Sequence, residues 1–210
     1  MKILTVFAHI DDAEIWCGGT LAKHSTRGDT IHTIAFTDKE EKRIAESNAA
    51  HKLINGTLTV LKRDIHNDSF SLVKKIEEIL FDQKPDILIS HWKDDSHPDH
   101  RKIFDIVSQA LIWPWIYNKS PLYFFSVDTY SSQGLSQAFN PDYIIDISET
   151  WQTKINMIHC FKSQPINIWK NMVAIQNKFY GERIESEYAE AFIQNPIQGK
   201  KIKNLYLPFP

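Results

Sequence analysis

Two clusters of polar residues in this sequence have the residue types and spacing for metal-assisted chemistry. The first is HIDD at residues 9–12, and the second is DDSHPDH at residues 94–100. Each follows a short apolar run that we interpret as a strand. Ligands of parallel sheets bind beyond the carboxyl ends of the strands, so two neighbouring strands would place both clusters in one crevice. The two clusters therefore predict a single site.

The donors in these clusters suit zinc. A catalytic zinc site uses three protein ligands, commonly imidazole nitrogen and carboxylate oxygen, and keeps one position for water. His9, Asp12 and His100 can supply that set, because a spacing of three across a strand-to-helix turn lets His9 and Asp12 reach one ion. Asp11 is then free to contact the metal-bound water, whose pKa zinc lowers from about 15.7 to about 7. We predict one zinc ion per chain, with Asp11 as general base.

Two further residues of the second cluster are catalytic candidates. His97, when protonated, can stabilise the oxyanion of a tetrahedral intermediate, and Asp99 can hydrogen-bond a ring nitrogen of a neighbouring histidine. Each cluster also has an ordinary explanation. An HxxD pattern occurs often by chance, and an Asp pair after a strand commonly caps a helix. Two histidines that flank a carboxylate on an exposed loop are harder to explain by packing.

Strand-like and helix-like patterns alternate along the chain, which predicts an α/β fold. We expect a Rossmann-like, doubly wound and mostly parallel sheet flanked by helices, in a single domain over residues 1–210. The expected strands are residues 2–8, 30–37, 57–61, 87–89, 122–127, 143–147 and 187–193. The expected helices are residues 13–27, 42–54, 71–83, 101–112, 149–162 and 167–180.

Composition excludes several classes of protein. Hydrophobic residues make up 42% of the 210 residues and charged residues 24%, which is typical of a globular protein, and the formal net charge is −2. This balance gives no electrostatic footprint for nucleic acid or an anionic membrane. No apolar run reaches the roughly 18 residues of a bilayer span. Two cysteines far apart fit a reducing compartment, so we expect a cytoplasmic protein.

At this point the motifs resemble a known family. AHIDDAE at residues 8–14, followed by GGT at 18–20, is similar to the AHPDDE…GGT signature of the PIG-L/LmbE-like deacetylases. HPDH at residues 97–100 matches the second motif of that family letter for letter. YIIDIS at 143–148 and YAEAF at 188–192 resemble later family segments. One departure is Ile10, which stands where the first motif usually has proline.

The resemblance implies zinc on His9, Asp12 and His100, with Asp11 as the base and His97 as the electrostatic catalyst. It implies removal of an acyl group from an amino sugar or a similar molecule, since the family includes deacetylases of N-acetylglucosaminyl-phosphatidylinositol, of thiol-cofactor precursors, of diacetylchitobiose and of antibiotic intermediates.

Substrate-binding candidates are less specific. RIAE at residues 43–46 is similar to an Arg-x-x-Glu segment of the family, which makes Arg43 a candidate, although a solvated helix charge explains it equally well. Asp68 follows the third expected strand and is either a rim residue or a turn residue. Trp92 lies inside the second motif loop. Tyr188 and Glu190 either close the pocket or pack at a sheet edge.

The function expected from the sequence is therefore hydrolysis of an N-acetyl group on an amino-sugar-containing small molecule. Two alternatives stay open: a metal-dependent amidase that acts on a larger thiol or peptide-like conjugate, and a non-catalytic nucleotide- or flavin-binding module. Against the module, no G-x-G-x-x-G or P-loop follows the first strand. A homo-oligomer is also open, with Trp113–Tyr117 as a candidate interface.

Overall fold

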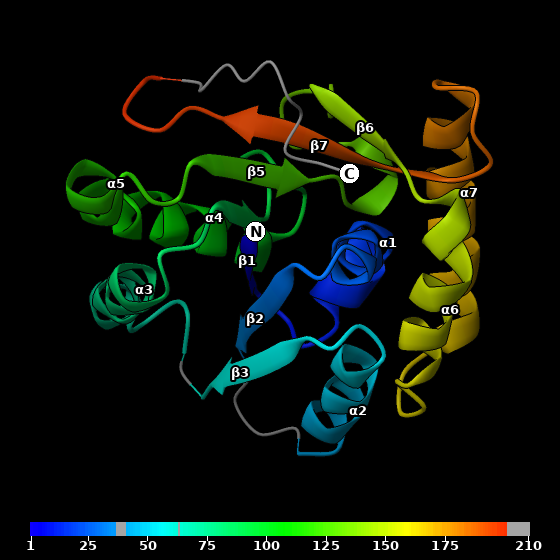
Figure 1. Cartoon of the computed structure of the whole chain (residues 1–210), viewed down its shortest axis with the longest axis horizontal. Coiled ribbons are helices and arrows are strands. Elements are labelled where there is room, and N and C mark those ends of the chain that lie inside the picture. Colours follow the sequence, from blue (N-terminus) through cyan, green and yellow to red (C-terminus); the bar gives the residue numbers. More distant parts are fainter. Residues whose placement is uncertain (37–40, 63, 201–210) are drawn as a thin grey trace.

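Within residues 1–36, 41–62 and 64–200, which the computed structural model describes, seven strands form one sheet in the order β3-β2-β1-β4-β5-β7-β6 (Figure 1). Neighbouring strands from β3 to β5 are parallel, whereas β7 is antiparallel to both β5 and β6. The strands are β1 (Lys2–Phe7), β2 (Thr30–Phe36), β3 (Thr57–Leu61), β4 (Ile87–Ser90), β5 (Tyr123–Val127), β6 (Tyr143–Asp146) and β7 (Ala189–Asn195).

Helices cover both faces of this sheet, so the molecule has three layers (Figure 1). One layer contains α1 (Asp12–Thr26), α2 (Glu41–Lys52), α6 (Trp151–His159) and α7 (Ile166–Glu182). The other contains α3 (Ser69–Gln83), α4 (Pro98–Ala110) and α5 (Ile112–Asn118). Two short 3₁₀ turns, η1 (Tyr130–Ser132) and η2 (Ser148–Thr150), follow β5 and β6. The predicted α/β class with a mostly parallel sheet is confirmed.

The alternation of side chains along β1 explains why both faces are covered. Ile3 and Phe7 pack in the cluster that includes α1 and α6, whereas Leu4 and Val6 pack in the cluster that includes α3 and α4. Successive side chains of a strand point to opposite faces, so a strand that is apolar at nearly every position must be buried on both. The expected continuous apolar run over residues 2–8 is this strand.

Two expected elements differ from the structure. The helix expected at 101–112 begins earlier, at Pro98, because proline is well suited to a first helical turn. The following segment forms a separate helix, α5, in which Pro114 is buried, and Trp113 and Tyr117 are exposed. The oligomer suggested for that segment stays a prediction. Residue 37, the expected end of the second strand, lies outside the described residues.

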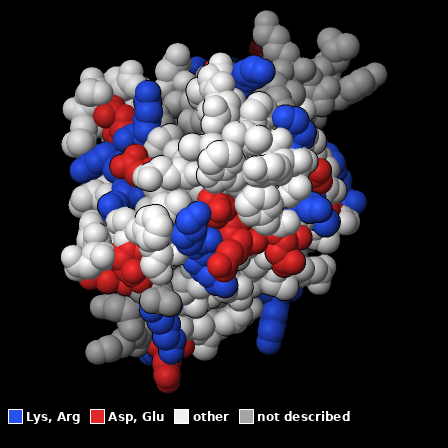
Figure 2. Space-filling model, turned by 90° about the vertical axis from the view of Figure 1, so that its left-hand side faces the viewer, with Lys and Arg blue, Asp and Glu red and all other residues white. Residues whose placement is uncertain are grey.

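The side of the molecule that carries α3 and α5 has basic and acidic side chains next to one another (Figure 2). Two of these neighbours are ion pairs along α3, Lys74 with Glu77 at 3.3 Å and Lys75 with Glu78 at 3.2 Å. On this face, charges of both signs are therefore interspersed. No helix in the described part of the chain has the length and apolarity needed to cross a membrane.

The sheet order positions the two motifs. β1 lies directly beside β4, with Ile3 aligned to Ile87 and Val6 to Ser90. Their carboxyl ends therefore lie together, and the segments that follow Phe7 and Ser90 leave the sheet at the same edge. The two strands are neighbours, as the single-site hypothesis requires.

Candidate metal centre

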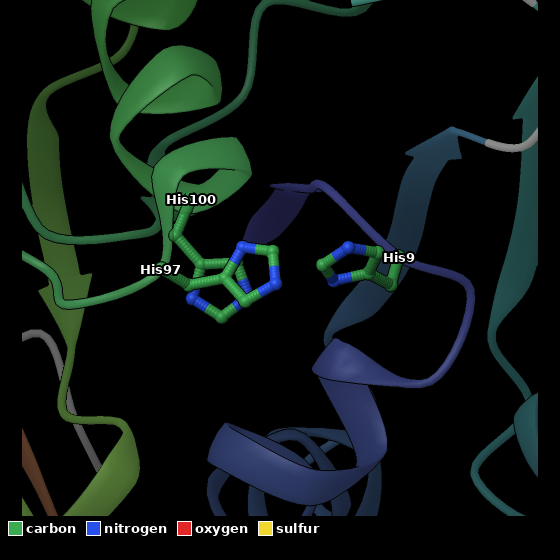
Figure 3. Close-up of side chains that lie close together, drawn as sticks. All are labelled: His9, His97 and His100. Carbon is green, nitrogen blue, oxygen red and sulfur yellow. The ribbon is translucent and has the colours of Figure 1, made fainter.

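Three histidines from the two motifs converge at this edge. His9 lies in the turn between β1 and α1, while His97 and His100 come from the beginning of α4, and their rings face one another (Figure 3). The ring centroid of His9 lies 5.0 Å from that of His97 and 5.3 Å from that of His100. One ring nitrogen from each of the three lies close enough to the others for a shared metal ion.

Asp12 is the carboxylate among these rings, and it is buried. Its Oδ2 lies 3.1 Å from His9 Nδ1, and its Oδ1 lies 3.5 Å from His100 Nε2. The backbone N–H of His9 and the indole N–H of Trp16 donate to Asp12 as well. Burial opposes ionisation, but His100, His9 and His91 hold the pKa of Asp12 well below its usual range. The site therefore holds a buried anion that requires positive charge nearby.

His100 has the clearest ring nitrogen available to coordinate a metal ion. Its Nδ1 hydrogen-bonds Oδ2 of the buried Asp95 at 2.9 Å, and its buried Nε2 has no hydrogen-bond partner among the described residues. Burial lowers the pKa of His100, but Asp12 and Asp95 together raise it to about 9. A nitrogen oriented in this way, with a carboxylate behind its ring, is the arrangement that metal-ligating histidines use. This chemistry fits a divalent cation.

Two other histidines lie near this point but have committed their lone pairs. Ligand atoms of Asp12, His91 and His100 lie close enough together to hold a metal ion. However, His91 Nε2 already accepts the backbone N–H of Ala8 at 2.9 Å. The backbone N–H of Asp99 donates to His97 Nδ1 at 3.2 Å, so the proton of the neutral His97 ring lies on Nε2. The predicted ligand set, His9, Asp12 and His100, includes the buried carboxylate and a ring nitrogen without a hydrogen-bond partner among the described residues; its role as the ligand set stays a prediction.

Asp11 lies beside this set and is held by Arg43. The guanidinium Nε of Arg43 donates to Asp11 Oδ2 at 2.9 Å, and its NH2 group contacts the same oxygen. Burial and the neighbouring Asp12 raise the pKa of Asp11 to about 6, despite the opposing effect of Arg43. A carboxylate with a pKa close to neutrality is suited to accept a proton. The structure therefore brings Arg43, a substrate-binding candidate, into contact with the predicted base.

Asp99 bridges two histidines at the open side of the cluster. Its Oδ2 lies 3.3 Å from His9 Nε2, and its Oδ1 lies 2.8 Å from His66 Nε2. This agrees with the predicted hydrogen bond from Asp99 to a histidine ring. His66 was not among the predicted site residues, although Asp68, two positions later, was. Asp68 itself precedes α3, and its substrate role stays a prediction.

Two other predicted substrate residues lie elsewhere. Trp92 is buried, packs edge-on against Phe139 and lines a cavity of about 720 Å³ whose lining contains none of the clustered histidines. Tyr188 stacks on Trp151 with ring centroids 3.9 Å apart and interplanar angle 7°. Packing accounts for both positions. Their predicted contacts with substrate stay predictions, with no support from this arrangement.

The turn that carries His9 and Asp12 depends on a distant strand. Helix α1 has a non-helical residue at Cys17, and the backbone N–H groups of Gly19 and Thr20 beyond it donate to Glu190 of β7 at 2.9 and 2.8 Å. Lys154 of α6 is fully buried and donates to the same carboxylate at 2.6 Å. Glu190 thus satisfies backbone groups that the break in α1 leaves open.

Sequence reasoning missed three of these residues. Asp95 was within the second motif loop but carried no predicted role, although an aspartate five positions before a ligand histidine is a signal for ring orientation. Glu190 was attributed to pocket closure or edge packing. Tyr130, whose ring lies 5.5 Å from that of His100, follows β5 and belongs to no recognised motif.

Comparisons with known proteins bear on this arrangement. Residues 4–64 match the family model described as PIG-L: GlcNAc-PI de-N-acetylase. Diacetylchitobiose deacetylase from Thermococcus kodakarensis is 24% identical over 227 residues, which cover 90% of this chain and 81% of that protein. The predicted resemblance to the PIG-L/LmbE-like family is confirmed. The segment that matches PIG-L includes His9, Asp11, Asp12 and Arg43, whereas HPDH at residues 97–100 lies beyond it.

Solved structures also resemble this chain. N,N′-diacetylchitobiose deacetylase from Pyrococcus horikoshii has a TM-score of 0.77 at 24% identity, covering 97% of this chain and 87% of that one. The 4-carboxy-2-hydroxymuconate hydratase from Pseudomonas putida has a TM-score of 0.79 at 18% identity, covering 98% and 99%. At these identities the likeness establishes the fold, which is compatible with more than one reaction.

Proposed function

We propose that this chain is a zinc-dependent hydrolase that removes an N-acetyl or other N-acyl group from an amino sugar or an amino-sugar-containing small molecule. The observation that carries the proposal is the environment of one buried carboxylate: Asp12 Oδ2 lies 3.1 Å from His9 Nδ1, and Asp12 Oδ1 lies 3.5 Å from His100 Nε2. The family match and the deacetylase relative support the reaction type.

One ion per chain would be held by His9, Asp12 and His100. Such a divalent ion, when bound, polarises a carbonyl oxygen and lowers the pKa of water to about 7. Proton removal falls to Asp11, whose carboxylate lies next to Asp12 and whose pKa is raised to about 6. At neutral pH Asp11 is mostly ionised, yet it is basic enough to take a proton from the attacking water. Arg43 fixes the carboxylate through its Nε–H.

His97 has the geometry of a neutral hydrogen-bond donor. Its Nδ1 accepts the Asp99 N–H, which leaves Nε2–H as the donating group toward the cluster. Burial and the neighbouring His100 and His9 lower the pKa of His97. We therefore revise the expectation of a protonated His97: the neutral ring would donate Nε2–H to the carbonyl oxygen as negative charge develops there. The proton taken by Asp11 then passes to the leaving amine.

The same residues could also serve the addition of water to a carbon–carbon double bond, since a hydratase shares this fold. We favour amide hydrolysis because the family match lies on the segment with His9, Asp11 and Asp12, and because the relative aligned over 90% of this chain is a deacetylase.

The test is metal analysis combined with release of free amine. Purified protein, stripped with a chelator and reloaded with one equivalent of zinc, is incubated with N-acetylglucosamine and with N,N′-diacetylchitobiose. We expect amine release by the reloaded protein and none by the stripped protein. A protein that binds zinc yet releases no amine from any N-acyl amino sugar, but hydrates an unsaturated acid, would instead be a hydratase.

Three variants separate the roles. His100→Ala should lose the metal. Asp11→Asn should keep the metal and lose about 10²–10⁴ in turnover, the usual contribution of a positioned base. His97→Ala should keep the metal and lose about 10²–10³, the typical cost of one oxyanion donor. The exposed His159 on α6 offers a matched control, and His159→Ala should change neither quantity. Full activity in Asp11→Asn would refute the assignment of the base.

A further inference from the structure

Tyr130 lies against the histidine cluster but belongs to neither motif. Its ring is nearly parallel to those of His100 and His97, at 20° to each, with centroids 5.5 and 6.1 Å away. On another side it meets the edge of Trp16, with centroids 5.0 Å apart. Trp16 in turn donates its indole N–H to Asp12. Tyr130 therefore lies directly beside the predicted ligand His100, and only Trp16 separates it from Asp12.

The backbone around Tyr130 is held in an unusual conformation. Tyr130 has φ +36°, which is rare for a bulky residue and persists only where the surrounding structure imposes it. On one side, Thr129 donates to Asp95 at 2.5 Å. On the other, Ser132 donates to the buried Asp128. These contacts hold the backbone segment that carries Tyr130.

Asp128 and Asp95, the two carboxylates that hold this segment, are themselves part of buried hydrogen-bond networks. Asp128 accepts hydrogen bonds from Gln176 and Tyr180 of α7, each at 2.7 Å. Asp95 is the carboxylate that orients His100. The segment that carries Tyr130 is thus tied to α7 at one end and to the second motif at the other. Its position relative to the cluster is determined by the fold.

The spacing decides what the ring can do. An aliphatic chain inserted between two rings needs roughly 7–8 Å, because carbon atoms approach to about 3.5–4 Å on each side. The separations of 5.5 and 6.1 Å leave no such room. Tyr130 therefore closes this side of the cluster, and its side chain remains partly exposed, so one part of it faces outward.

The surroundings of the cluster differ in polarity. Toward His9 and Asp11 the neighbours are His66, Asp99 and Arg43, which are suited to sugar hydroxyl groups. Toward His97 and His100 the neighbour is the ring of Tyr130, and Trp16 meets that ring from another side. Burial and the carboxylates of Asp12 and Asp95 raise the pKa of Tyr130, so the phenol stays neutral. An apolar acyl group fits the aromatic side.

We propose that Tyr130 determines acyl specificity: its ring closes the side of the cluster toward which a longer acyl chain would extend, so that acetyl is accepted and longer acyl chains are excluded. This inference rests on the proposed function, because it assumes that the acyl carbonyl lies at His97. The ring, rather than the hydroxyl group, performs this role.

The test compares N-acetyl-, N-butyryl- and N-hexanoylglucosamine as substrates, with kcat and KM measured for each. In Tyr130→Ala we expect the ratio of kcat/KM for hexanoyl over acetyl to rise at least about tenfold, since fitting or rejecting a methylene group commonly changes selectivity 10–200-fold. Tyr130→Phe keeps the ring and should stay within about twofold of wild type. Phe70→Ala, at an exposed aromatic residue of α3, is the matched control and should leave the ratio unchanged.

The outcomes distinguish the two proposals. If wild-type protein releases no amine from any of the three substrates, the proposed function fails. Suppose that wild type is active. If Tyr130→Ala is folded and metal-loaded but keeps the wild-type ratio, the proposal for Tyr130 is overturned. A loss of turnover in Tyr130→Phe as large as in Tyr130→Ala would also overturn it, because the hydroxyl group would then be responsible. Circular dichroism and metal content establish that each variant is folded and loaded.

Discussion

Asp95 Oδ2 accepts the Nδ1 hydrogen bond of His100 at 2.9 Å, and the same oxygen accepts the hydroxyl of Thr129 at 2.5 Å. The other oxygen of Asp95 accepts the backbone N–H of His97 at 2.8 Å. One buried carboxylate therefore orients the ring of a predicted ligand and the start of the helix that carries it. The two histidines of the second motif share this support.

Replacing Asp95 should weaken metal binding although Asp95 is not a ligand. In Asp95→Asn the ring of His100 loses its anionic partner, and we expect zinc affinity to fall about 10–100-fold, the range for such outer partners. Competition with a chromogenic chelator measures the affinity. The side chain of the neighbouring Asp94 accepts hydrogen bonds from residues 136 and 137, away from the histidines. Asp94→Asn is therefore the control. Equal affinities in the two variants would contradict the assigned role of Asp95.

Lys154 should be essential for stability. Its ammonium group is buried and bonds Glu190 at 2.6 Å and Asn177 at 2.8 Å. Lys154→Met leaves the Glu190 charge buried without a cation, and we expect a loss of about 3–5 kcal/mol in the free energy of unfolding. Urea denaturation measures it. Lys75→Met removes an exposed ion pair on α3 and should stay close to wild type. A Lys154→Met variant as stable as Lys75→Met would show that the buried pair contributes nothing.

Adjacent glycines of α1 should respond in opposite directions to alanine. A Cβ at Gly19 would lie 2.6 Å from Cδ1 and 2.9 Å from Cβ of Ile147, a fully buried residue. We expect Gly19→Ala to destabilise by about 1–3 kcal/mol through overpacking. A Cβ at Gly18 would lie 3.4 Å from Lys154 Cγ, which can adjust. Gly18→Ala should therefore be neutral or stabilising by up to about 1 kcal/mol. Thermal denaturation compares them, and equal melting temperatures would disprove the steric argument.

His24 should make stability fall in mild acid. Burial lowers its pKa from 6.5, and its hydrogen bond with Asp29 offsets this only in part. The unfolded chain therefore binds a proton that the folded chain resists, so this contribution is complete above pH 6.5 and is lost as the pH falls toward the lower folded value.

The variant His24→Asn retains a donor near Asp29 but does not titrate. Between pH 7.5 and pH 5, we expect wild type to lose more unfolding free energy than this variant, as measured by urea midpoints. Other titrating groups contribute to both proteins and cancel in the difference. If the two losses are identical, His24 is not a proton-linked group.

The fold was largely predictable because its strands are apolar on both faces. β1 and β4 carry uninterrupted apolar runs, and the polar clusters begin where these runs stop. The mixed end of the sheet was not predictable in the same way. β7 pairs antiparallel with β5 and β6. The residue pattern within one strand does not predict which strands it pairs with. The separate helix α5 was not predicted, because a proline such as Pro114 usually argues against a helix.

The predicted ligands could be found from the sequence because their spacing lies within two short motifs. His9 and Asp12 are held by one turn, and His100 follows from the position of α4 after β4. The surrounding side chains required the tertiary structure. Trp92 was a substrate-binding candidate because it lies in the second motif loop, but its ring packs against Phe139. Tyr130, in contrast, comes from a segment with no motif of its own.

The bond from Gly19 to Glu190 joins residues 171 positions apart. A fragment of the chain that ends after α4 would contain every proposed ligand and the proposed base. It would lack the carboxylate that secures the broken first helix, and the lysine that neutralises it. During synthesis on a ribosome, the motifs would emerge early, but the turn that carries His9 and Asp12 would acquire its final rigidity only once β7 had been made. Capture of the proposed ion would then be coupled to completion of the sheet.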